Sequence, residues 1–268
     1  MLLILFSCSN DENQISEPVV DNIYFPAIDS DQWETINPEE LNWNSLGIDN
    51  LYNFLQLNNT RAFIVLKDGK IVLEKYWGNN VLNTAPFDSN SNWYWASAGK
   101  TLTAFLVGIA KDNGILSLED SSSIFLGNGW TSLEESQENL IKIKHHLTMT
   151  TGLDFLVDNL DCTDPNCLTY KNTPGTNWFY HNATYSLLKD VIENASETTY
   201  NDFTNQKVKM KIGMGGSWIQ LNNSDTYYST ARDMARFGLL ILNEGVWDED
   251  VILNDTNYFL NMVNKNHN

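Results

Sequence analysis

The strongest constraint on the fold is residues 93–111, where an aromatic run leads directly into an apolar helix: W-Y-W-A-S-A-G-K-T-L-T-A-F-L-V-G-I-A-K. Large apolar residues fall on nearly every side of the helical part, so almost no polar face remains. A helix of this kind lies inside a core and not along a surface. The rest of the chain is therefore expected to pack around it.

Ser97 and Lys100 stand three residues apart at the start of this helix. Helical residues at that spacing share a face, with their Cβ atoms about 5–6 Å apart. Burial favours the neutral amine of a lysine, and a neutral amine can accept the proton of a serine hydroxyl. The S-x-x-K spacing is therefore compatible with an activated nucleophile. A serine near a helix N-terminus beside a snorkelling lysine would give the same pattern.

The same S-x-x-K pattern occurs a second time, as Ser186 with Lys189 in S-L-L-K. This occurrence falls on a predicted amphipathic helix, where Lys189 is expected to face solvent. We therefore attribute the second occurrence to chance.

A Y-x-N pattern also occurs twice, as Tyr170 with Asn172 and as Tyr180 with Asn182. A tyrosine near a cation can serve as a general base or proton relay, and an asparagine can hold a lysine and bind a substrate amide. The second pattern follows P-G-T and opens a predicted helix, which would hold it rigidly. Tyr180 and Asn182 are therefore the favoured partners of the serine and lysine.

Composition excludes several classes of partner. The chain has 268 residues, 42% of them hydrophobic, so it can bury a large core as one domain or two lobes. Its formal net charge of −18 would repel nucleic acid and anionic membrane surfaces. An acidic, solubilising surface is the simplest interpretation of this charge.

The N-terminus predicts export. The sequence L-F-S-C at residues 5–8 is similar to a bacterial lipobox, in which Cys8 would receive the lipid after cleavage of the signal. A truncated ordinary signal peptide is the alternative. Residues 9–35 are acidic and polar and predict a linker, which leaves residues 36–268 as the domain. We therefore expect an extracytoplasmic bacterial lipoprotein, in the periplasm or on the outer membrane, that contacts the membrane only through its anchor.

The two remaining cysteines, Cys162 and Cys167, lie in D-C-T-D-P-N-C. In an exported protein they are expected to form a disulfide that closes a short loop. A zinc site is the alternative, but C-x4-C without a second cysteine pair or a nearby histidine does not supply four ligands. No metal or cofactor is expected. His145 and His146 are adjacent, which is not a ligand spacing on one helix face, so we interpret them as structural.

Local patterns predict an α+β fold with an all-helical insertion. Residues 62–77 form two β-rich runs around Asp68-Gly69, a strong hairpin signal. Further helices are expected within residues 33–59, over residues 141–149, over residues 183–193, and after a capping box formed by Thr230 with Asp233.

Four motifs in order resemble the serine β-lactamase-related hydrolases: S-A-G-K, H-H-L-T-M-T-T-G-L, P-G-T-N-W-F-Y-H-N and Y-S-T-A-R-D-M-A-R-F-G-L-L-I-L-N-E-G. Within this family the chain is most similar to the class C branch with its esterases, D-amino-acid peptidases and 6-aminohexanoate-oligomer hydrolases. The resemblance covers residues 61–253. It implies a β-lactamase/transpeptidase-like fold, with an antiparallel sheet flanked by helices and an all-helical lobe.

The resemblance also implies roles. Ser97 would be the acylated nucleophile, with its own backbone N–H as one oxyanion donor, and Lys100 would activate it. Tyr180 would carry the proton to the leaving group and later activate water, while Asn182 would orient Lys100 and the substrate. His181 replaces a residue that is usually small in the family, so it would narrow the pocket or contact the leaving group. The substrate would be a small-molecule or peptide amide or ester, cleaved through a covalent ester in two steps.

One departure from the family pattern lies at the end of the chain. The third family motif, K-T-G or H-x-G on a sheet strand, does not follow the late helix. Residues 211–213, K-I-G, precede that helix and lie where the family has a turn. The C-terminal strands are therefore expected to be absent, and a missing oxyanion donor costs about 10²–10³ in rate. We expect a fragment of a longer hydrolase, or a degenerate copy with little activity.

Other functional classes fit the sequence less well. A non-catalytic peptidoglycan or β-lactam sensor, acylated without turnover, is the alternative on the same scaffold. The sequence contains no G-x-S-x-G elbow and no H-E-x-x-H motif, which argues against an α/β-hydrolase and a zinc peptidase.

Overall fold

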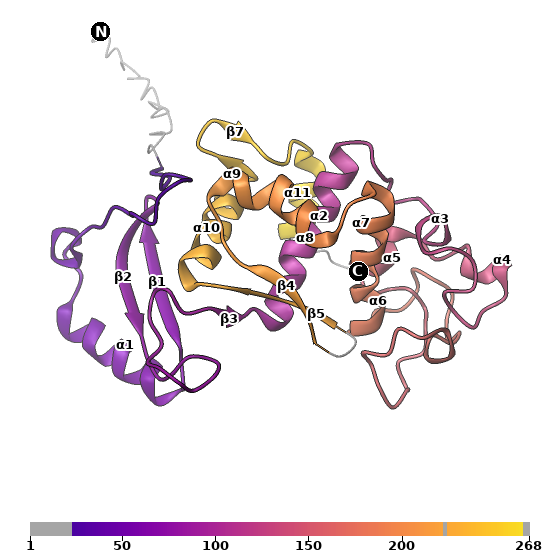
Figure 1. Cartoon of the computed structure of the whole chain (residues 1–268), viewed down its shortest axis with the longest axis horizontal. Helices are drawn as coiled ribbons and strands as arrows, with labels where there is room; N and C mark the ends of the chain where they lie inside the picture. Colours follow the sequence, from indigo (N-terminus) through magenta and orange to yellow (C-terminus); the bar gives the residue numbers. More distant parts are fainter. Residues whose placement is uncertain (1–22, 222–223, 265–268) are drawn as a thin grey trace, which may run out of the picture.

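The computed structural model describes residues 23–221 and 224–264 (Figure 1). Cys8 and the predicted signal, together with residues 9–22 of the predicted linker, lie outside the described residues. No helix in the described part is long and apolar enough to cross a membrane.

The predicted hairpin is present. Strand β1 (Ala62–Lys67) pairs antiparallel with β2 (Lys70–Tyr76). The turn residues Asp68 and Gly69 both have positive φ, 52° and 81°, the combination that matches the twist of a two-residue hairpin loop.

The described end of the predicted 9–35 linker differs from a free tether, because residues 23–35 lie against the hairpin and the core. The Trp33 indole N–H donates a 2.7 Å hydrogen bond to the carbonyl of Gly69, and Trp33 is buried. The carbonyl of Tyr24 lies so close to Gly69 that a Cβ there would be 1.8 Å away. The apolar residues within this acidic stretch therefore anchor it to the domain.

The region predicted to hold one helix contains a short 3-10 turn, η1 (Pro38–Leu41), and the helix α1 (Ser45–Leu57). Helix α1 begins at Asn44, whose side chain accepts a hydrogen bond from the backbone N–H of Gly47. Much of its apolar side is exposed: Leu46, Phe54 and Leu57.

The second sheet joins distant parts of the chain in the order β3-β5-β4, and a third sheet is a short antiparallel pair. These strands are β3 (Trp93–Tyr94), β4 (Ser217–Leu221), β5 (Ser224–Ser229), β6 (Val246–Trp247) and β7 (Asp250–Val251). Among the strands within the described residues, β1 pairs only with β2. Strand β3 leads directly to the central helix.

Helix α2 (Gly99–Asp112) runs through the middle of the molecule, as the apolar pattern predicts (Figure 1). Six of its apolar side chains are at most 2% exposed: Leu102, Phe105, Leu106, Val107, Ile109 and Ala110. A short 3-10 turn, η2 (Ala96–Ala98), precedes it, and Gly114 at φ 70° follows its end.

The helical lobe covers one side of α2. Its elements are α3 (Ser123–Leu126), α4 (Glu135–Glu138), α5 (Ile143–Leu147), η3 (Pro165–Cys167), α6 (Asn182–Ser186), α7 (Leu188–Ser196), α8 (Tyr200–Thr204), η4 (Asn205–Lys209) and α9 (Met210–Ile212). The predicted helix over residues 183–193 is thus two helices that meet at Leu187. A second, smaller core lies within this lobe: Trp130, Ile141, Leu153, Leu168, Ala183 and Leu187.

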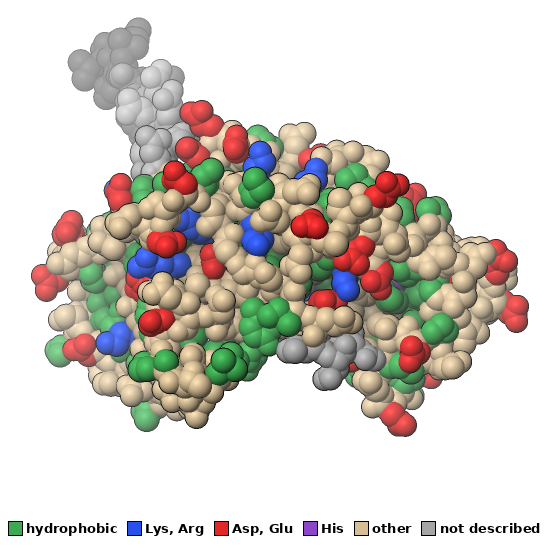
Figure 2. Space-filling view, in the orientation of Figure 1, with side chains coloured by type: hydrophobic (Ala, Val, Ile, Leu, Met, Phe, Trp, Pro, Cys, Tyr) green, Lys and Arg blue, Asp and Glu red, His purple; other side chains and the backbone are tan. Residues whose placement is uncertain are grey.

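Helix α10 (Ala231–Leu242) packs against β1, and α11 (Thr256–Val263) packs against α2. The predicted capping box is present, because the Thr230 side chain accepts from the Asp233 N–H while the Asp233 carboxylate accepts from the Thr230 N–H. The whole is an α+β fold of antiparallel sheets and helices. On the face shown in Figure 2, acidic side chains are scattered over the surface, consistent with the net charge of −18.

Candidate active site

Ser97 lies in the tight turn η2 between β3 and α2. Ala96 just before it has φ 46°, a left-handed conformation that a non-glycine residue adopts only when its surroundings hold it. The Trp95 backbone N–H donates to the carbonyl of Tyr227 at 2.8 Å, and its indole N–H donates to Ser229 Oγ at 2.8 Å. Strand β5 therefore fixes the turn that carries the serine.

The structure brings Ser97 and Lys100 together as the spacing predicts. Lys100 Nζ lies 3.5 Å from Ser97 Oγ, at the outer limit of a hydrogen bond. Both side chains line a polar pocket of about 200 Å³. Ser97 is exposed and Lys100 is half-buried, so a substrate can reach the hydroxyl while the amine is partly shielded from water.

Two tyrosine rings contact the Lys100 ammonium. Its Nζ lies 5.3 Å from the ring centroid of Tyr180 and 5.7 Å from that of Tyr185. The Tyr185 hydroxyl donates a 2.8 Å hydrogen bond to the backbone carbonyl of Lys100. Burial raises the pKa of Tyr185 above its ordinary value, so its hydroxyl remains a donor at neutral pH. Tyr185 is a site residue that the sequence analysis missed.

Tyr180 presents its ring face to Lys100. It is 40% exposed, and its hydroxyl makes no hydrogen bond to any residue in the described ranges. The backbone beneath Tyr180 joins two segments, because the Phe179 N–H donates to the carbonyl of Met149 and the Gly175 N–H donates to that of Thr150. We call these paired segments the Tyr180 platform. The motifs H-H-L-T-M-T-T-G-L and P-G-T-N-W-F-Y-H-N, separate in sequence, therefore form one unit beneath the tyrosine.

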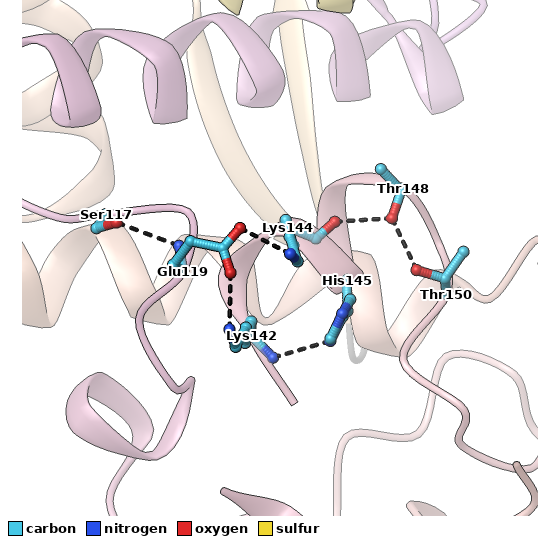
Figure 3. Close-up of polar contacts among 7 residues, drawn as sticks. All are labelled: Ser117, Glu119, Lys142, Lys144, His145, Thr148 and Thr150. Carbon is cyan, nitrogen blue, oxygen red and sulfur yellow. Dashed lines mark hydrogen bonds and ion pairs between the residues drawn. The ribbon is translucent and has the colours of Figure 1, made fainter. Parts of the chain in front are cut away.

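Charged and polar side chains make a set of contacts around helix α5, which leads into the Tyr180 platform (Figure 3). Glu119 accepts hydrogen bonds of 2.7 Å from the ammonium groups of both Lys142 and Lys144. These two bonds lower the pKa of Glu119 to about 2. Thr148 donates to the carbonyl of Lys144 and shares a 2.8 Å hydrogen bond with Thr150. The segment that ends at Thr150 is thus tied back onto its own helix.

His146 holds the lobe together. Its Nε2 lies 2.9 Å from Ser122 Oγ and its Nδ1 lies 2.6 Å from the carbonyl of Thr184, both inside the core. Burial lowers the pKa of His146 to about 4, so the ring is neutral at physiological pH. Across the part of the chain that the structure describes, no group of His, Cys, Asp or Glu side chains is arranged to hold a metal ion.

Asn182 lines the pocket, but the predicted contact with Lys100 is not made. Its Oδ1 is buried and has no hydrogen-bond partner among the described residues. His181 differs from its predicted role as a substrate contact: it is 3% exposed and does not line the pocket. Its Nε2 faces the carbonyl of Asp154 at 3.3 Å, because the ring turns into the loop before α6.

The position of the second S-x-x-K pattern differs from the expectation that Lys189 faces solvent. Ser186 and Lys189 line the same pocket as Ser97, and Lys189 does not face open solvent. Its Nζ lies 3.3 Å from Asp225 Oδ2 on β5, with both side chains largely buried. Asn182, Tyr185, Ser186 and Lys189 follow the i, i+3, i+4, i+7 spacing of one helical face. That spacing was the signal that would have revealed the face.

The alternative motifs lie elsewhere. Tyr170, of the other Y-x-N pattern, is 48% exposed and does not line the pocket. Residues 211–213 form the end of α9, where Gly213 has φ 65°, so K-I-G is a helix terminus here and not a strand. Cys162 and Cys167 form a disulfide in the loop that precedes α6.

Comparison with known families gives one match. Residues 60–260, which cover most of the described fold, match the family model described as Beta-lactamase. A search of curated proteins finds no match.

Several solved structures share the fold. A protein from Bacillus anthracis assigned as a 6-aminohexanoate-dimer hydrolase has a TM-score of 0.62 at 19% identity, and the match covers 76% of this chain. A penicillin-binding protein from Bacillus halodurans has a TM-score of 0.61 at 18% identity over 78% of this chain and 76% of its own. The octameric penicillin-binding protein homologue from Pyrococcus abyssi has a TM-score of 0.61 at 18% identity over 81% of this chain. The match spans 59% of the length of the first and third of these proteins.

Proposed function

This chain belongs to the beta-lactamase family, and from that premise we propose that it is a serine hydrolase that cleaves an amide or ester bond through an acyl-enzyme on Ser97. The observation that carries the proposal is the 3.5 Å approach of Lys100 Nζ to Ser97 Oγ at the wall of a pocket. An amine at this position can take the hydroxyl proton as the oxygen attacks a carbonyl carbon.

The pocket supports a division of labour among the remaining side chains. Tyr180 lies over Lys100 on the exposed side, where its hydroxyl is free to pass a proton to the leaving group and then to draw one from water. Asn182 provides a buried amide oxygen without a partner, which suits it to bind a donor on the substrate. The Ser97 backbone N–H is proposed as one oxyanion donor.

Export to an extracytoplasmic site through a lipid anchor on Cys8 is part of the same proposal. The Cys162–Cys167 disulfide supports an oxidising compartment. Metabolic labelling with an alkyne fatty acid tests it: label on the full chain that is lost in Cys8→Ser is expected, and equal label on both chains would contradict the anchor.

Labelling with a fluorophosphonate probe tests the nucleophile. The wild-type chain is expected to react and Ser97→Ala to lose the label, with circular dichroism showing that both are folded. Ser186→Ala is the matched control, because it removes a hydroxyl from the same pocket and the same S-x-x-K spacing. Label that persists in Ser97→Ala and disappears in Ser186→Ala would move the nucleophile to the other motif.

Turnover distinguishes a hydrolase from a sensor that is acylated once. Steady release of nitrophenol from p-nitrophenyl acetate after the first equivalent supports the hydrolase. A burst of one equivalent without a steady phase, with the acyl group retained on the Ser97 peptide by mass spectrometry, supports the sensor.

A further inference from the structure

A second cavity adjoins the polar pocket of Ser97. It is a groove of about 1280 Å³, and Lys100 and Tyr185 line both the groove and the pocket. Trp95 and Ala98, from the segment that carries the serine, line the groove as well. A substrate whose carbonyl group lies at Ser97 can therefore extend past Lys100 into the groove.

Helix α2 runs along this groove. The residues that it contributes to the lining begin with Ala98 and Lys100, continue through Thr101 and Ala104, and end with Lys111. At a helical rise of about 1.5 Å per residue, the step from Lys100 to Lys111 is about 16 Å. The groove is thus long enough for an extended chain of several carbon atoms.

Apolar side chains line the groove from two sides. Trp178 of the helical lobe is 68% exposed and Met234 of α10 is 42% exposed, so large apolar surfaces there are open to water. Grouped apolar surface of this kind marks a binding groove more often than an ordinary protein surface. Further apolar lining residues are Leu147, Met149, Ile241 and Met262.

Most charged groups of the groove already have partners. Lys111 pairs with Asp255, and Lys144 pairs with Glu119 at 2.7 Å. Among the lining residues that the structure describes, only the charge of Lys100, at the end next to the serine, is not in an ion pair. A charged ligand would find no unpaired charge farther along the groove, and a buried charge without a partner is costly. The groove therefore favours a neutral apolar ligand.

We propose that this groove binds an unbranched apolar chain of the substrate, so that the preferred substrate is a neutral amide or ester with such a chain on one side of its scissile bond. This inference rests on the proposed function of Ser97. A chain that lies against Trp178 removes apolar surface from water, and the gain grows with each methylene group. The flexible side chains of Met149, Met234 and Met262 can adapt to chains of different length. The chain itself remains unchanged through acylation and hydrolysis.

Two series of esters test the groove. In p-nitrophenyl alkanoates the acyl chain grows from two to eight carbons, and in n-alkyl acetates the leaving alcohol grows over the same range. Because the groove is open on one side, kcat/KM in at least one series is expected to rise about twofold for each methylene beyond four carbons, about half of the effect of full burial on a free-energy scale. The series that rises shows on which side of the bond the chain lies. Constant kcat/KM across both series would overturn the inference.

Matched variants on one helix locate the effect. Met234→Glu puts a charge in the groove, and Leu242→Glu puts the same charge at a position of α10 that is 69% exposed and does not line the groove. The ratio of kcat/KM for the longest ester to that for the shortest is expected to fall at least threefold in Met234→Glu and to keep its wild-type value in Leu242→Glu. Circular dichroism shows that both variants are folded. The same ratio in all three chains would contradict the groove.

A binding measurement separates failure of the groove from failure of the proposed function. Calorimetry with 1-octanol and with 1-butanol needs no reaction at Ser97. Tighter binding of octanol by wild type and by Ser97→Ala, weakened in Met234→Glu, supports the groove even if no ester is cleaved. Equal binding of the two alcohols to the wild-type chain overturns it even if esters are cleaved. A dimer in light scattering that Met234→Glu dissociates would assign the groove to a second copy of the chain and overturn it as well.

Discussion

The Tyr185 hydroxyl donates a 2.8 Å hydrogen bond to the backbone carbonyl of Lys100, 85 residues earlier in the chain, and its ring faces the ammonium of the same lysine. The two contacts hold both the backbone and the side chain of Lys100 from α6. Tyr185→Phe keeps the ring and removes the bond. It is expected to lower the free energy of unfolding by about 1 kcal/mol and kcat/KM several-fold, because Lys100 loses an anchor.

Urea unfolding and ester hydrolysis measure these two effects. Tyr170→Phe is the control, because it removes a phenol hydroxyl from an exposed side chain outside the pocket. A Tyr185→Phe chain that matches both wild type and the control in turnover would show that the hydrogen bond does not position Lys100.

Gly152 belongs to the first of the two motifs beneath Tyr180 and packs against the backbone just before the second. It has φ 78°, and a Cβ at this position would lie 2.1 Å from the carbonyl oxygen of Asn172. Gly152→Ala therefore combines left-handed strain of about 1–2 kcal/mol with a backbone clash of about 1–3 kcal/mol. Gly114→Ala is the matched control, because Gly114 has φ 70° and no atom within 4 Å of its Cβ position.

Thermal and urea unfolding of the two variants separate the two effects, because Gly114→Ala introduces only the left-handed strain whereas Gly152→Ala adds the backbone clash. We expect the larger loss of stability in Gly152→Ala, together with weaker fluorophosphonate labelling of Ser97 as the Tyr180 platform shifts. Equal losses in the two variants would mean that the backbone near Asn172 moves aside at little cost.

Some of the fold could be predicted because local chemistry decides it. The Asp68-Gly69 turn needs two residues with positive φ, and the cap of α10 needs only Thr230 and Asp233, so each signal lies within a few residues. The family fold and the approach of Ser97 to Lys100 follow from short motifs as well.

Other parts of the site depend on packing between distant elements. The sequence analysis assigned Lys189 to solvent because the direction in which α7 faces is set by β5, which supplies Asp225. His181 was expected in the pocket, yet the residue packs toward Asp154, since the loop before α6 encloses it. The acidic composition of residues 23–35 suggested a tether. The indole of Trp33 instead anchors this stretch to the domain, because it donates a hydrogen bond to the carbonyl of Gly69. The helical spacing places Lys189 on one face with Asn182, but no local pattern identifies Asp225, Asp154 or Gly69 as the partners in these contacts.

His146 makes stability depend on pH. Its pKa is lowered by burial from 6.5 to about 4, so between these values the unfolded chain binds a proton that the folded chain does not. The contribution of His146 to the free energy of unfolding is therefore fully present above about pH 6.5, and it is lost as the pH falls toward 4. The shift corresponds to about 3 kcal/mol when integrated over that range.

Urea unfolding between pH 7.5 and 4.5 measures this dependence. Burial also lowers the pKa values of His145 and His181, so the informative quantity is the difference in slope between wild type and His146→Gln. The variant is expected to be less stable at pH 7.5 and less sensitive to acid. Parallel curves for the two chains would show that His146 titrates normally in the folded state.

Arg232 and Glu74 tie α10 to the hairpin. The guanidinium donates from Nε and from a terminal nitrogen to the two oxygens of the Glu74 carboxylate, each at 2.7 Å. The two side chains are 30% and 17% exposed, so water screens the pair only in part. Without Arg232 the Glu74 carboxylate keeps only the Tyr76 hydroxyl as a donor, and without Glu74 the guanidinium keeps the carbonyl of Asp31. A double-mutant cycle with Glu74→Gln and Arg232→Gln is expected to give a coupling energy of about 2 kcal/mol.

The ion pair between Lys70 and Glu34 provides the matched comparison, because it also involves β2 but its side chains are 37% and 56% exposed. Its coupling energy is expected to be smaller than that of the Arg232–Glu74 pair and to fall further in high salt. Since Arg232 begins the helix that packs on β1, its loss should also loosen the contact between the hairpin and the rest of the domain. Amide exchange in β1 that rises in Arg232→Gln and not in Lys70→Gln would locate that contact, whereas equal coupling energies for the two pairs would show that the bidentate geometry adds nothing.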